Sequence, residues 1–364
     1  MKVLQVINSL NTGGAEKLLL DSIPIFNKKG IEMDLFLLNG NEYPFLQELK
    51  KQEVCEVYTN GNKSVYNPRH IFSIMKFMSK YDVIHVHLFP SQYWVILAKI
   101  FSRSKTKLVF TEHCTTNRRM ENYFFKKINK ISYRFYDFNI SISKEILETY
   151  VNYTGLPYSR FRLIPNGVNL EGIKQAEPIS KNEINPNIKE KDKLLIQVSG
   201  FREQKDQPTL IKSLTYLEDN VKLLLVGEGV TKDTCIELVK NLGLEDRVFF
   251  LGVRTDVPRL LKSSNIVVLS THYEGMSLAC IEGMSSGRPF IASDVPGMSE
   301  IAEGAAILFE EENTEELSVE IKKLLTDERY YAEIVDKCQK RADNYDINTL
   351  VDANIEVYKE ALKK

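Results

Sequence analysis

Short apolar runs alternate with longer segments of helical spacing along residues 1–170. Runs this short and this apolar are typical of parallel strands that are buried on both faces. The predicted strands are residues 3–7, 32–38, 54–58, 83–86, 108–110 and 139–142, with a last one near Arg162. Between them, segments such as 16–27, 70–79 and 123–136 carry apolar residues every three or four positions, which predicts helices. This alternation predicts a doubly wound α/β domain.

A second series of the same kind begins after a polar segment. Residues 170–193 contain Pro178, Pro186 and many Lys and Glu, which indicates an interdomain linker. The strands predicted for the second series are residues 194–199, 221–226, 248–251, 266–269 and 290–292, and the tail, 315–325 and 328–364, is predicted to be helical. We therefore expect a first domain over 1–170, a linker over 171–193, a second domain over 194–345 and a last helix over 346–364.

The composition agrees with two globular domains of ordinary size. The chain has 364 residues, of which 43% are hydrophobic and 27% charged, and its mean hydropathy is -0.24. No apolar run approaches the roughly 20 residues of a membrane-spanning helix, and the first residues are predicted to be a strand rather than a signal peptide. The five cysteines are odd in number and none are spaced as a pair of ligands. This argues against disulfides and structural zinc and favours a reducing cytoplasm.

Charge is divided unevenly between the two halves. Residues 1–170 hold 23 of the 48 Lys and Arg but only 14 of the 49 Asp and Glu, which leaves 25 and 35 for the remainder. A basic first half favours an anionic ligand or surface. Nucleic acid is not the expected partner, because the second half is acidic and no nucleic-acid-binding motif is present.

The stretch 266–301 carries the clearest candidate chemistry. A predicted strand is followed by a loop with Glu274 and then by a helix with Glu282, and seven residues lie between these two carboxylates. A carboxylate accepts hydrogen bonds at two oxygens and suits the vicinal diol of a ribose or a pyranose. The start of a helix suits bound phosphate; here its residues are Gly275, Met276, Ser277 and Leu278. Gly287 is predicted to end the helix with a positive φ. The alternative is that Glu274 caps the helix and Glu282 is solvated.

The string EGMSLACIEGMSSGRPFIASDVPGMSEI closely resembles the donor-site signature of the retaining glycosyltransferases of family 4, with its pattern of Glu, seven residues, Glu. The resemblance implies an α/β GT-B fold, in which two Rossmann-like domains face each other across a cleft and the last helix crosses back to the first domain. It also implies sugar transfer from a nucleotide-diphosphate sugar to an acceptor hydroxyl, with no metal ion or other cofactor. Glu282 would then hold the ribose diol, and Glu274 would hold and orient hydroxyls of the donor sugar.

Two motifs of the first half fit this resemblance. Gly13 and Gly14 follow the first strand; taken alone they form a tight turn before a helix, and the full G-x-G-x-x-G pattern of a dinucleotide site is missing. The resemblance places them in a glycine loop beside the donor phosphates and the acceptor. His113 follows a predicted strand and matches a family histidine near the transferred sugar and the departing phosphate, although such a histidine is otherwise often structural. His85 and His87 share one face of a strand, but no nearby carboxylate or third histidine supports a metal site.

Lys205 and Arg202 follow the first strand of the second series, in the sequence SGFREQK. Cations there would neutralise the charge that grows on a departing nucleoside diphosphate. The segment resembles the phosphate motif of the family, and Lys205 matches its lysine. The family's arginine falls on Gly200, and Arg202, two positions later on the same side of an extended chain, is predicted to replace it. By the same resemblance Gly227 lies in a turn near the nucleotide and Val253 in the segment that lines the base; without it, both belong to structural turns.

Residues 118–136 combine cations with apolar residues. The cations are Arg118, Arg119, Lys126, Lys127, Lys130 and Arg134, and the apolar residues are Tyr123, Phe124, Phe125, Ile128, Ile131, Tyr133, Phe135 and Tyr136. A basic amphipathic helix can lie on an anionic membrane surface, where each cation contributes about 1 kcal/mol. The alternative, a core helix with a solvated basic face, has equal support from the sequence.

These features predict a retaining, hexosyltransferase-type enzyme in the cytoplasm, peripheral to the inner face of the membrane. We expect a nucleotide-sugar donor, in the first place a UDP-sugar, and a lipid-linked or polysaccharide acceptor, as in the synthesis of capsules and other cell-surface polysaccharides. His113, Lys205 and Glu274 are the predicted catalytic residues. One alternative is a nucleotide-sugar epimerase of the same fold, which needs no acceptor. Another is a non-catalytic nucleotide-sugar-binding protein, for which the departure at Gly200 is the only support.

Overall fold

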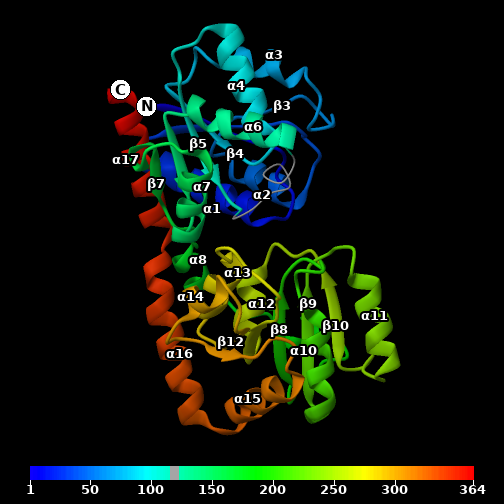
Figure 1. Cartoon of the computed structure of the whole chain (residues 1–364). Coiled ribbons are helices and arrows are strands. Elements are labelled where there is room, and N and C mark those ends of the chain that lie inside the picture. Colours follow the sequence, from blue (N-terminus) through cyan, green and yellow to red (C-terminus); the bar gives the residue numbers. More distant parts are fainter. Residues whose placement is uncertain (115–122) are drawn as a thin grey trace. The chain divides into compact units, whose positions relative to one another are not determined.

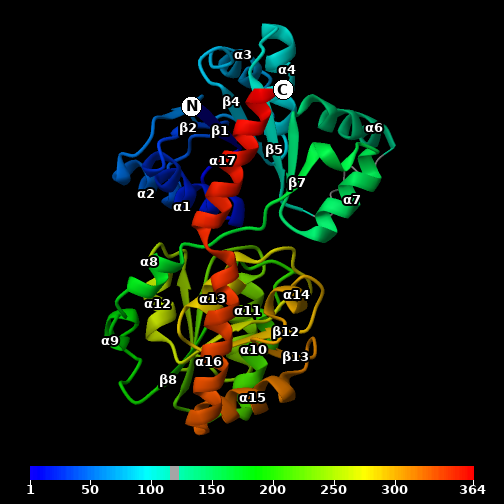
Figure 2. The same cartoon turned by 90° about the vertical axis from the view of Figure 1, so that its left-hand side faces the viewer.

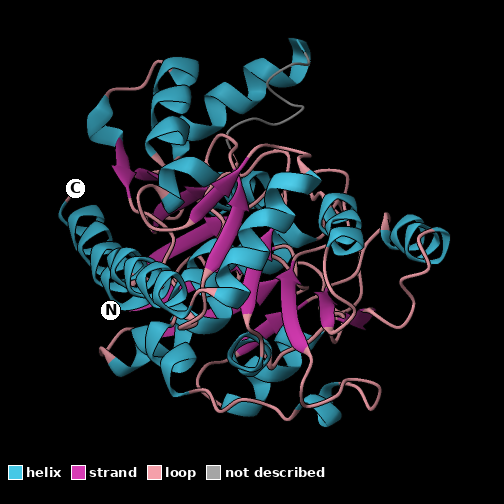
Figure 3. Ribbon diagram, turned by 90° about the horizontal axis from the view of Figure 1, so that it is seen from below, coloured by secondary structure: helices cyan, strands magenta, loops and turns pink. Residues whose placement is uncertain are grey.

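The computed structural model describes residues 1–114 and 123–364. The chain forms two compact units, of which the first comprises Met1–Gly167 and Ile347–Lys364 and the second comprises Val168–Asp346 (Figures 1 and 2). Each unit is built on one sheet, and all strand pairs within both sheets are parallel. Figure 3 shows the strands in magenta among the surrounding helices. Two Rossmann-like α/β units are therefore present, as the sequence predicts.

The sheet of the first unit has the strand order β3-β2-β1-β4-β5-β6-β7. Its strands are β1 (Lys2–Ile7), β2 (Glu32–Leu37), β3 (Val57–Thr59), β4 (Val83–His87), β5 (Lys107–Glu112), β6 (Phe138–Ser141) and β7 (Phe161–Leu163). Its helices are α1 (Gly14–Lys28), α2 (Pro44–Gln52), α3 (His70–Met75), α4 (Ser91–Ser102), α6 (Tyr123–Ser132), α7 (Lys144–Thr154) and α17 (Ile347–Lys363), with the short 3-10 turns η1 (Tyr133–Phe135) and η2 (Tyr158–Arg160). Every residue of β4 is buried. Because side chains alternate along a strand, both faces of the sheet are covered.

The last helix, α17, belongs to the first unit and packs against α1. Its buried residues recur every three or four positions, from Ile347 to Ala361, which is the pattern of a helix with one face in a core. The sequence predicts a helical tail over 328–364 whose last helix covers 346–364, and the structure shows where one helix ends and the next begins. α16 (Glu328–Ala342) ends in a 3-10 turn, η4 (Asp343–Tyr345), and the chain is extended at Asp346 before α17 begins.

The sheet of the second unit has the order β10-β9-β8-β11-β12-β13. Its strands are β8 (Lys193–Val198), β9 (Val221–Val226), β10 (Val248–Gly252), β11 (Ile266–Leu269), β12 (Phe290–Ser293) and β13 (Ile307–Phe309). Its helices are α8 (Leu170–Gln175), α9 (Lys181–Ile184), α10 (Gln207–Ser213), α11 (Lys232–Asn241), α12 (Val257–Ser263), α13 (Leu278–Ser285), α14 (Met298–Ala302), α15 (Thr314–Thr326) and α16, with η3 (Leu214–Tyr216). The five predicted strands are present, and β13 is an edge strand that the sequence analysis did not predict.

The polar segment 171–193 is not a linker but part of the second unit. Asn169 caps α8, and Ser180 and Glu183 form a capping box at the start of α9. Four isoleucines of this segment are buried: Ile173, Ile179, Ile184 and Ile188. Widely spaced apolar residues in a charged segment give a weak periodic signal, and the capping box was the sequence feature that could have revealed the helix.

None of the helices in the described part of the chain combines the length and the apolar character that a bilayer crossing requires.

Candidate functional site

The strand order of the second unit reverses at β8, which lies between β9 and β11. At such a switch point the loops that follow the two central strands diverge, and in open parallel sheets ligands bind in the crevice outside the carboxyl ends of those strands. Residues 199–206 follow β8 and residues 270–277 follow β11. These two loops contain most of the site residues that the sequence predicts for the second unit.

Hydrogen bonds join the two loops to each other. Lys205 and Thr271 form an antiparallel bridge. The carbonyl of Gln204 accepts from the backbone N–H of His272 at 2.9 Å and from the Thr271 hydroxyl at 3.0 Å. The side-chain amide of Gln204 donates to the carbonyl of Tyr273 at 2.7 Å. Gln204 and Thr271 thus hold the loops in register; the sequence analysis missed both, because a pairing between residues 67 positions apart has no local signal.

Lys205 and Glu274 form a hydrogen-bonded ion pair between these loops. The two side chains are only 14% and 7% exposed, so both charges are largely shielded from water. Removal of one partner from a pair this buried leaves an uncompensated charge, at a cost of about 3–5 kcal/mol. Two residues that the sequence predicts as site residues are therefore in contact, and they present a cation and a carboxylate side by side at the switch point.

A glycine turn supports the Glu274 loop from behind. Gly297 has a φ of +80°, and a Cβ atom there would lie 2.2 Å from the carbonyl oxygen of Glu274 and 2.8 Å from that of Gly275. The backbone N–H of Glu274 points to the carbonyl of Pro296, at 3.4 Å. Position 297 therefore requires glycine both for its conformation and for the close approach of two backbones. The Pro-Gly pair was the available signal, and the sequence analysis did not assign it to the site.

Helix α13 begins immediately after the Glu274 loop. Ser277 is its N-cap residue, and the Ser277 side chain makes no capping hydrogen bond. Glu274 pairs with Lys205, so the alternative in which it acts as a helix cap is wrong. The helix ends at Ser285, and Gly287 has a φ of +75°, which confirms its predicted role.

Glu282 lies on α13 and is partly buried. It lines a small cavity together with Val198 and Leu269, the last residues of β8 and β11. Residue Glu282 therefore lies near the carboxyl ends of the same two strands that precede the Lys205–Glu274 pair.

Arg202 is exposed and lies in the loop after β8. Its Nε atom is 3.6 Å from the position that a Cβ atom would take on Gly200. The guanidinium of Arg202 therefore begins beside the place where a side chain of residue 200 would begin. The other neighbour of that position is the carbonyl oxygen of Glu228 at 3.5 Å, which is an ordinary contact and leaves room for a larger residue.

Gly227 and Gly229 allow the loop after β9 to approach the loop after β8. Their φ angles are +141° and +156°, and a Cβ atom on either would lie 2.1 Å from a carbonyl oxygen, that of Ser199 or Phe201. The Gly227 N–H also donates to the Gly252 carbonyl, at 2.8 Å, at the end of β10. Val253 follows Gly252 and is partly buried. Both predicted turn residues, Gly227 and Val253, thus lie beyond the carboxyl ends of neighbouring strands.

In the first unit the switch point lies between β1 and β4. Asn8 joins the two loops that follow them: its amide donates to the Phe89 carbonyl at 2.7 Å and accepts from the Ser91 hydroxyl at 2.8 Å. Gly14 begins α1, and Gly13 is its N-cap residue in an extended conformation. A Cβ atom on Gly13 would lie 2.3 Å from a carboxylate oxygen of Glu16, so this carboxylate lies over the predicted glycine loop.

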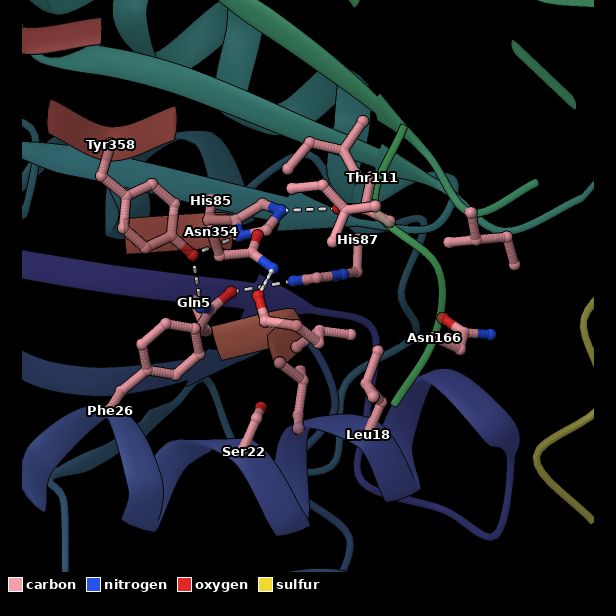
Figure 4. Close-up of a pocket in the computed structure, with 15 residues that line it drawn as sticks. Gln5, Leu18, Ser22, Phe26, His85, His87, Thr111, Asn166, Asn354 and Tyr358 are labelled. Atoms are coloured by element: carbon pink, nitrogen blue, oxygen red, sulfur yellow. Dashed lines mark hydrogen bonds between the residues drawn. The ribbon is translucent and has the colours of Figure 1, made fainter. Parts of the chain in front are cut away.

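His113 follows β5 directly, is partly buried, and is in hydrogen-bond contact with a chain of buried polar residues. Its Nε2 atom lies 3.1 Å from Nδ1 of His87, and Nε2 of His87 lies 2.8 Å from the Gln5 side-chain oxygen. His85 contacts the Tyr358 hydroxyl through Nδ1 and the Thr111 hydroxyl through Nε2, both at 2.7 Å. Figure 4 shows this cluster between β-strands and the helices α1 and α17, apart from His113. Gln5 and Tyr358 were not among the predicted site residues.

Burial keeps these histidines neutral. Loss of hydration lowers the pKa of His113 to about 4 and that of His85 to about 3, and it lowers the pKa of His87 well below the ordinary value. All four ring nitrogens of His85 and His87 are hydrogen bonded to protein side chains. The face that these two residues share therefore serves a hydrogen-bond network, and their lone pairs are engaged within the protein.

The basic helix α6 is described from Tyr123 onward, and Arg118 and Arg119 lie outside the described residues. Four apolar residues of α6 and the following turn are exposed, namely Phe125 (46%), Ile128 (42%), Ile131 (43%) and Phe135 (40%), whereas Tyr133 and Tyr136 are fully buried. The buried positions of α6 are polar, Asn129 and Ser132. The alternative in which the apolar face of this helix packs into the core is wrong for these four residues.

Two family models match the chain, one over each half. Glycosyltransferase Family 4 matches residues 12–171, and Glycosyl transferases group 1 matches residues 179–344. Together they span both units, and the chain belongs to the family 4 glycosyltransferases, enzymes of the GT-B fold.

Relatives and solved structures agree with this assignment. The chain is 26% identical, over 98% of its length and 97% of the other protein, to the N-acetylgalactosamine-N,N'-diacetylbacillosaminyl-diphospho-undecaprenol 4-alpha-N-acetylgalactosaminyltransferase of Campylobacter jejuni. It is 27% identical, over 62% of its length and 61% of the other protein, to the UDP-Gal:alpha-D-GlcNAc-diphosphoundecaprenol alpha-1,3-galactosyltransferase of Escherichia coli. The fold matches that of Anabaena Alr3699/HepE in complex with UDP and glucose, with a TM-score of 0.82 and 22% identity over 98% of this chain and 99% of that one.

Proposed function

We propose that this protein transfers a hexose-type sugar, with retention of anomeric configuration, from a UDP-sugar to a hydroxyl of a lipid-linked glycan. The observation that carries the proposal is the shielded Lys205–Glu274 ion pair at the switch point of the second unit. The named acceptors of the Campylobacter jejuni and Escherichia coli relatives, both glycans on diphospho-undecaprenol, support the acceptor class. The UDP-glucose complex of Anabaena HepE supports the donor class.

The charges of the second unit suit a nucleoside diphosphate. Lys205 and Arg202 supply two cations in the loop after β8, and the backbone N–H groups at the start of α13 supply further donors for phosphate oxygens. We propose that these groups carry the diphosphate charge without a metal ion or other cofactor. Glu282, beside the ends of β8 and β11, would accept hydrogen bonds from the ribose diol.

Glu274 orients the donor sugar in this proposal and does not attack it. The bond between the anomeric carbon and the phosphate oxygen breaks, and the acceptor oxygen bonds to that carbon on the same face. The acceptor proton passes to an oxygen of the departing diphosphate, so no protein base is required. Because burial lowers the pKa of His113 to about 4, its imidazole acts as a neutral hydrogen-bonding group at neutral pH and not as a cation.

An anionic membrane surface is the partner we propose for α6. Its exposed apolar residues recur at three-residue spacing, and Lys126, Lys127 and Lys130 lie among them, all exposed. Apolar residues would enter the interface while the cations remain near lipid phosphates. This location at the inner face of the membrane would bring the enzyme to a lipid-linked acceptor.

The test is donor turnover. Purified protein is mixed with UDP-, GDP- and ADP-sugars, with and without lipid-linked acceptor, and release of the nucleoside diphosphate is followed. Glu274→Ala is compared with Glu203→Ala, an exposed neighbour of Lys205. We expect release from a UDP-sugar that Glu274→Ala abolishes and Glu203→Ala leaves unchanged. A donor returned as its epimer, or a donor that binds and is never consumed, would contradict the proposal in favour of an epimerase or a binding protein.

A further inference from the structure

The hydrogen bonds around Gln5 have a direction that can be traced residue by residue. Gln5 lies on β1 and is 1% exposed. Its amide nitrogen is 3.3 Å from the sulfur of Met33 and 3.3 Å from the hydroxyl of Tyr358. A thioether sulfur accepts weakly and cannot donate, so the amide nitrogen, rather than the amide oxygen, faces Met33. The Gln5 oxygen is therefore the atom that faces His87 (Figure 4).

This orientation determines the tautomer of His87. The Gln5 oxygen can only accept, and it lies 2.8 Å from Nε2 of His87, so Nε2 carries a proton and donates it. His87 is 3% exposed and is surrounded by other neutral groups, which keeps it singly protonated. Its Nδ1 atom then has no proton and is an acceptor.

The tautomer of His87 in turn determines the tautomer of His113. Nδ1 of His87 lies 3.1 Å from Nε2 of His113, and an acceptor there requires Nε2 of His113 to donate. A neutral imidazole has a single N–H, so Nδ1 of His113 is left with its lone pair. No other hydrogen bond of the His113 ring is found among residues 1–114 and 123–364.

We infer that Gln5 and His87 are positioning residues that hold His113 as the Nε2–H tautomer, so that His113 accepts a hydrogen bond from a hydroxyl of the ligand and cannot donate one to a phosphate oxygen. Ligand phosphate oxygens are acceptors, and an unprotonated Nδ1 is also an acceptor, so no hydrogen bond can form between them. The identity of the ligand rests on the proposed function. Within it, His113 serves the sugar or the acceptor hydroxyl, and the diphosphate charge is left to other groups.

The last helix of the chain completes this network. The Tyr358 hydroxyl on α17 accepts from the Gln5 amide and lies 2.7 Å from Nδ1 of His85. It can donate there, and Nε2–H of His85 then donates to Thr111. Each of these groups has a partner of opposite character, so one consistent direction of donation runs through the cluster. Tyr358 is fully buried, which gives the network a fixed geometry.

The test reads the tautomer directly, without any substrate. Protein with ring-¹⁵N histidine is studied by two-bond ¹H–¹⁵N correlation at neutral pH, and His113→Asn assigns the signal among the five histidines. We expect the Nε2–H pattern for His87 and for His113. The Nδ1–H pattern for His113 in the unaltered protein would overturn the inference, whether or not transferase activity is found.

Variants separate positioning from packing. Gln5→Met keeps the length and burial of the side chain but removes the acceptor, so the Nδ1–H tautomer of His113 should become populated and kcat should fall about tenfold with little change in KM. Phe26→Leu, which changes the packing against the Tyr358 ring but removes no hydrogen-bonding group, should leave the tautomer unchanged. An unchanged tautomer in Gln5→Met would also overturn the inference. If Gln5→Met does not fold, the ¹H–¹⁵N pattern of His113 in the unaltered protein still tests the inference.

Discussion

Lys205 and Glu274 lie 69 positions apart in the chain and form an ion pair where β8 and β11 end. Each residue follows a central strand of one parallel sheet, and because β8 and β11 are adjacent and parallel, their loops leave the same edge of the sheet side by side. The pair therefore follows from the topology of the second unit and not from any local motif.

Removal of the charges of Lys205 and Glu274, one at a time and together, should distinguish their contribution to stability from their contribution to donor turnover. We expect Glu274→Gln and Lys205→Met each to lower the free energy of unfolding by about 3 kcal/mol, because each leaves one buried charge without its partner. The double variant should recover most of that loss yet remain inactive, because both ligand contacts are gone. Urea unfolding of all four proteins, together with donor turnover, provides the measurement. Losses that simply add in the double variant would show that the two charges do not interact.

An arginine at position 200 should be able to replace Arg202 as a contact to the donor phosphate. Arg202→Ala is expected to raise the KM for the donor about tenfold, the equivalent of about 1.4 kcal/mol, through loss of one phosphate contact. A Gly200→Arg change in the Arg202→Ala background should restore much of the affinity, since a Cβ atom at position 200 would begin 3.6 Å from Nε of Arg202. Glu203→Ala is the matched control. The idea fails if Arg202→Ala binds the donor like the unaltered protein.

Gly297 should tolerate no side chain. We expect Gly297→Ala to destabilise the protein by more than the roughly 1 kcal/mol that a positive φ alone costs, because the new Cβ atom would displace the Glu274 carbonyl. Gly304→Ala is the control, since Gly304 has a φ of +68° and no atom within 4 Å of its Cβ position. Thermal unfolding and donor turnover are measured for both variants. Gly304→Ala reports the cost of the positive φ alone, and Gly297→Ala reports that cost together with the contact between the new Cβ atom and the Glu274 carbonyl. Equal effects of the two changes would mean that contact with the Glu274 loop is unimportant.

Stability should fall in mild acid. The pKa of His113 is lowered to about 4 and that of His85 to about 3, so the unfolded chain, with histidine pKa near 6.5, binds more protons than the folded one between about pH 4 and 6.5. The free energy of unfolding should thus decrease as pH falls through this window, by up to about 1.4 kcal/mol per pH unit for each buried histidine.

His87→Gln provides the comparison for this pH effect. It removes one histidine whose pKa is lowered well below the ordinary value. The pH dependence of its urea midpoint between pH 4 and 6.5 should be weaker than that of the unaltered protein by about one proton. Identical slopes for the two proteins would show that His87 is not held neutral by the fold.

Membrane binding should depend on α6. We expect the protein to sediment with phosphatidylglycerol vesicles at low salt, less at high salt, and little with neutral vesicles. Changing Lys126, Lys127 and Lys130 to Gln should weaken binding about 100-fold, at about 1 kcal/mol per cation. Phe72→Ser, at an apolar residue of α3 that is 66% exposed, is the control and should have no effect. Absence of binding to phosphatidylglycerol vesicles at low salt would contradict the membrane proposal.

Much of the fold was predictable from the sequence because its signals are local. A parallel strand buried on both faces is a short apolar run, and eleven of the thirteen strands of the described chain overlap a predicted strand closely enough to be recognised. β3 was displaced and β13 was missed, because both are edge strands of three residues. The placement of Glu274 and Lys205 was predictable too, since each follows a predicted strand.

The sequence by itself thus determined the two α/β units, the loops that carry the charged residues and the family to which the signature points. Only the tertiary structure decided the pairing of Lys205 with Glu274, the outward apolar face of α6, and the contact of Tyr358 with Gln5 across 353 positions. The physical reason is that periodicity reports which positions along one element share a face. Which neighbour covers that face, and which polar atom meets which, depends on elements distant in the chain.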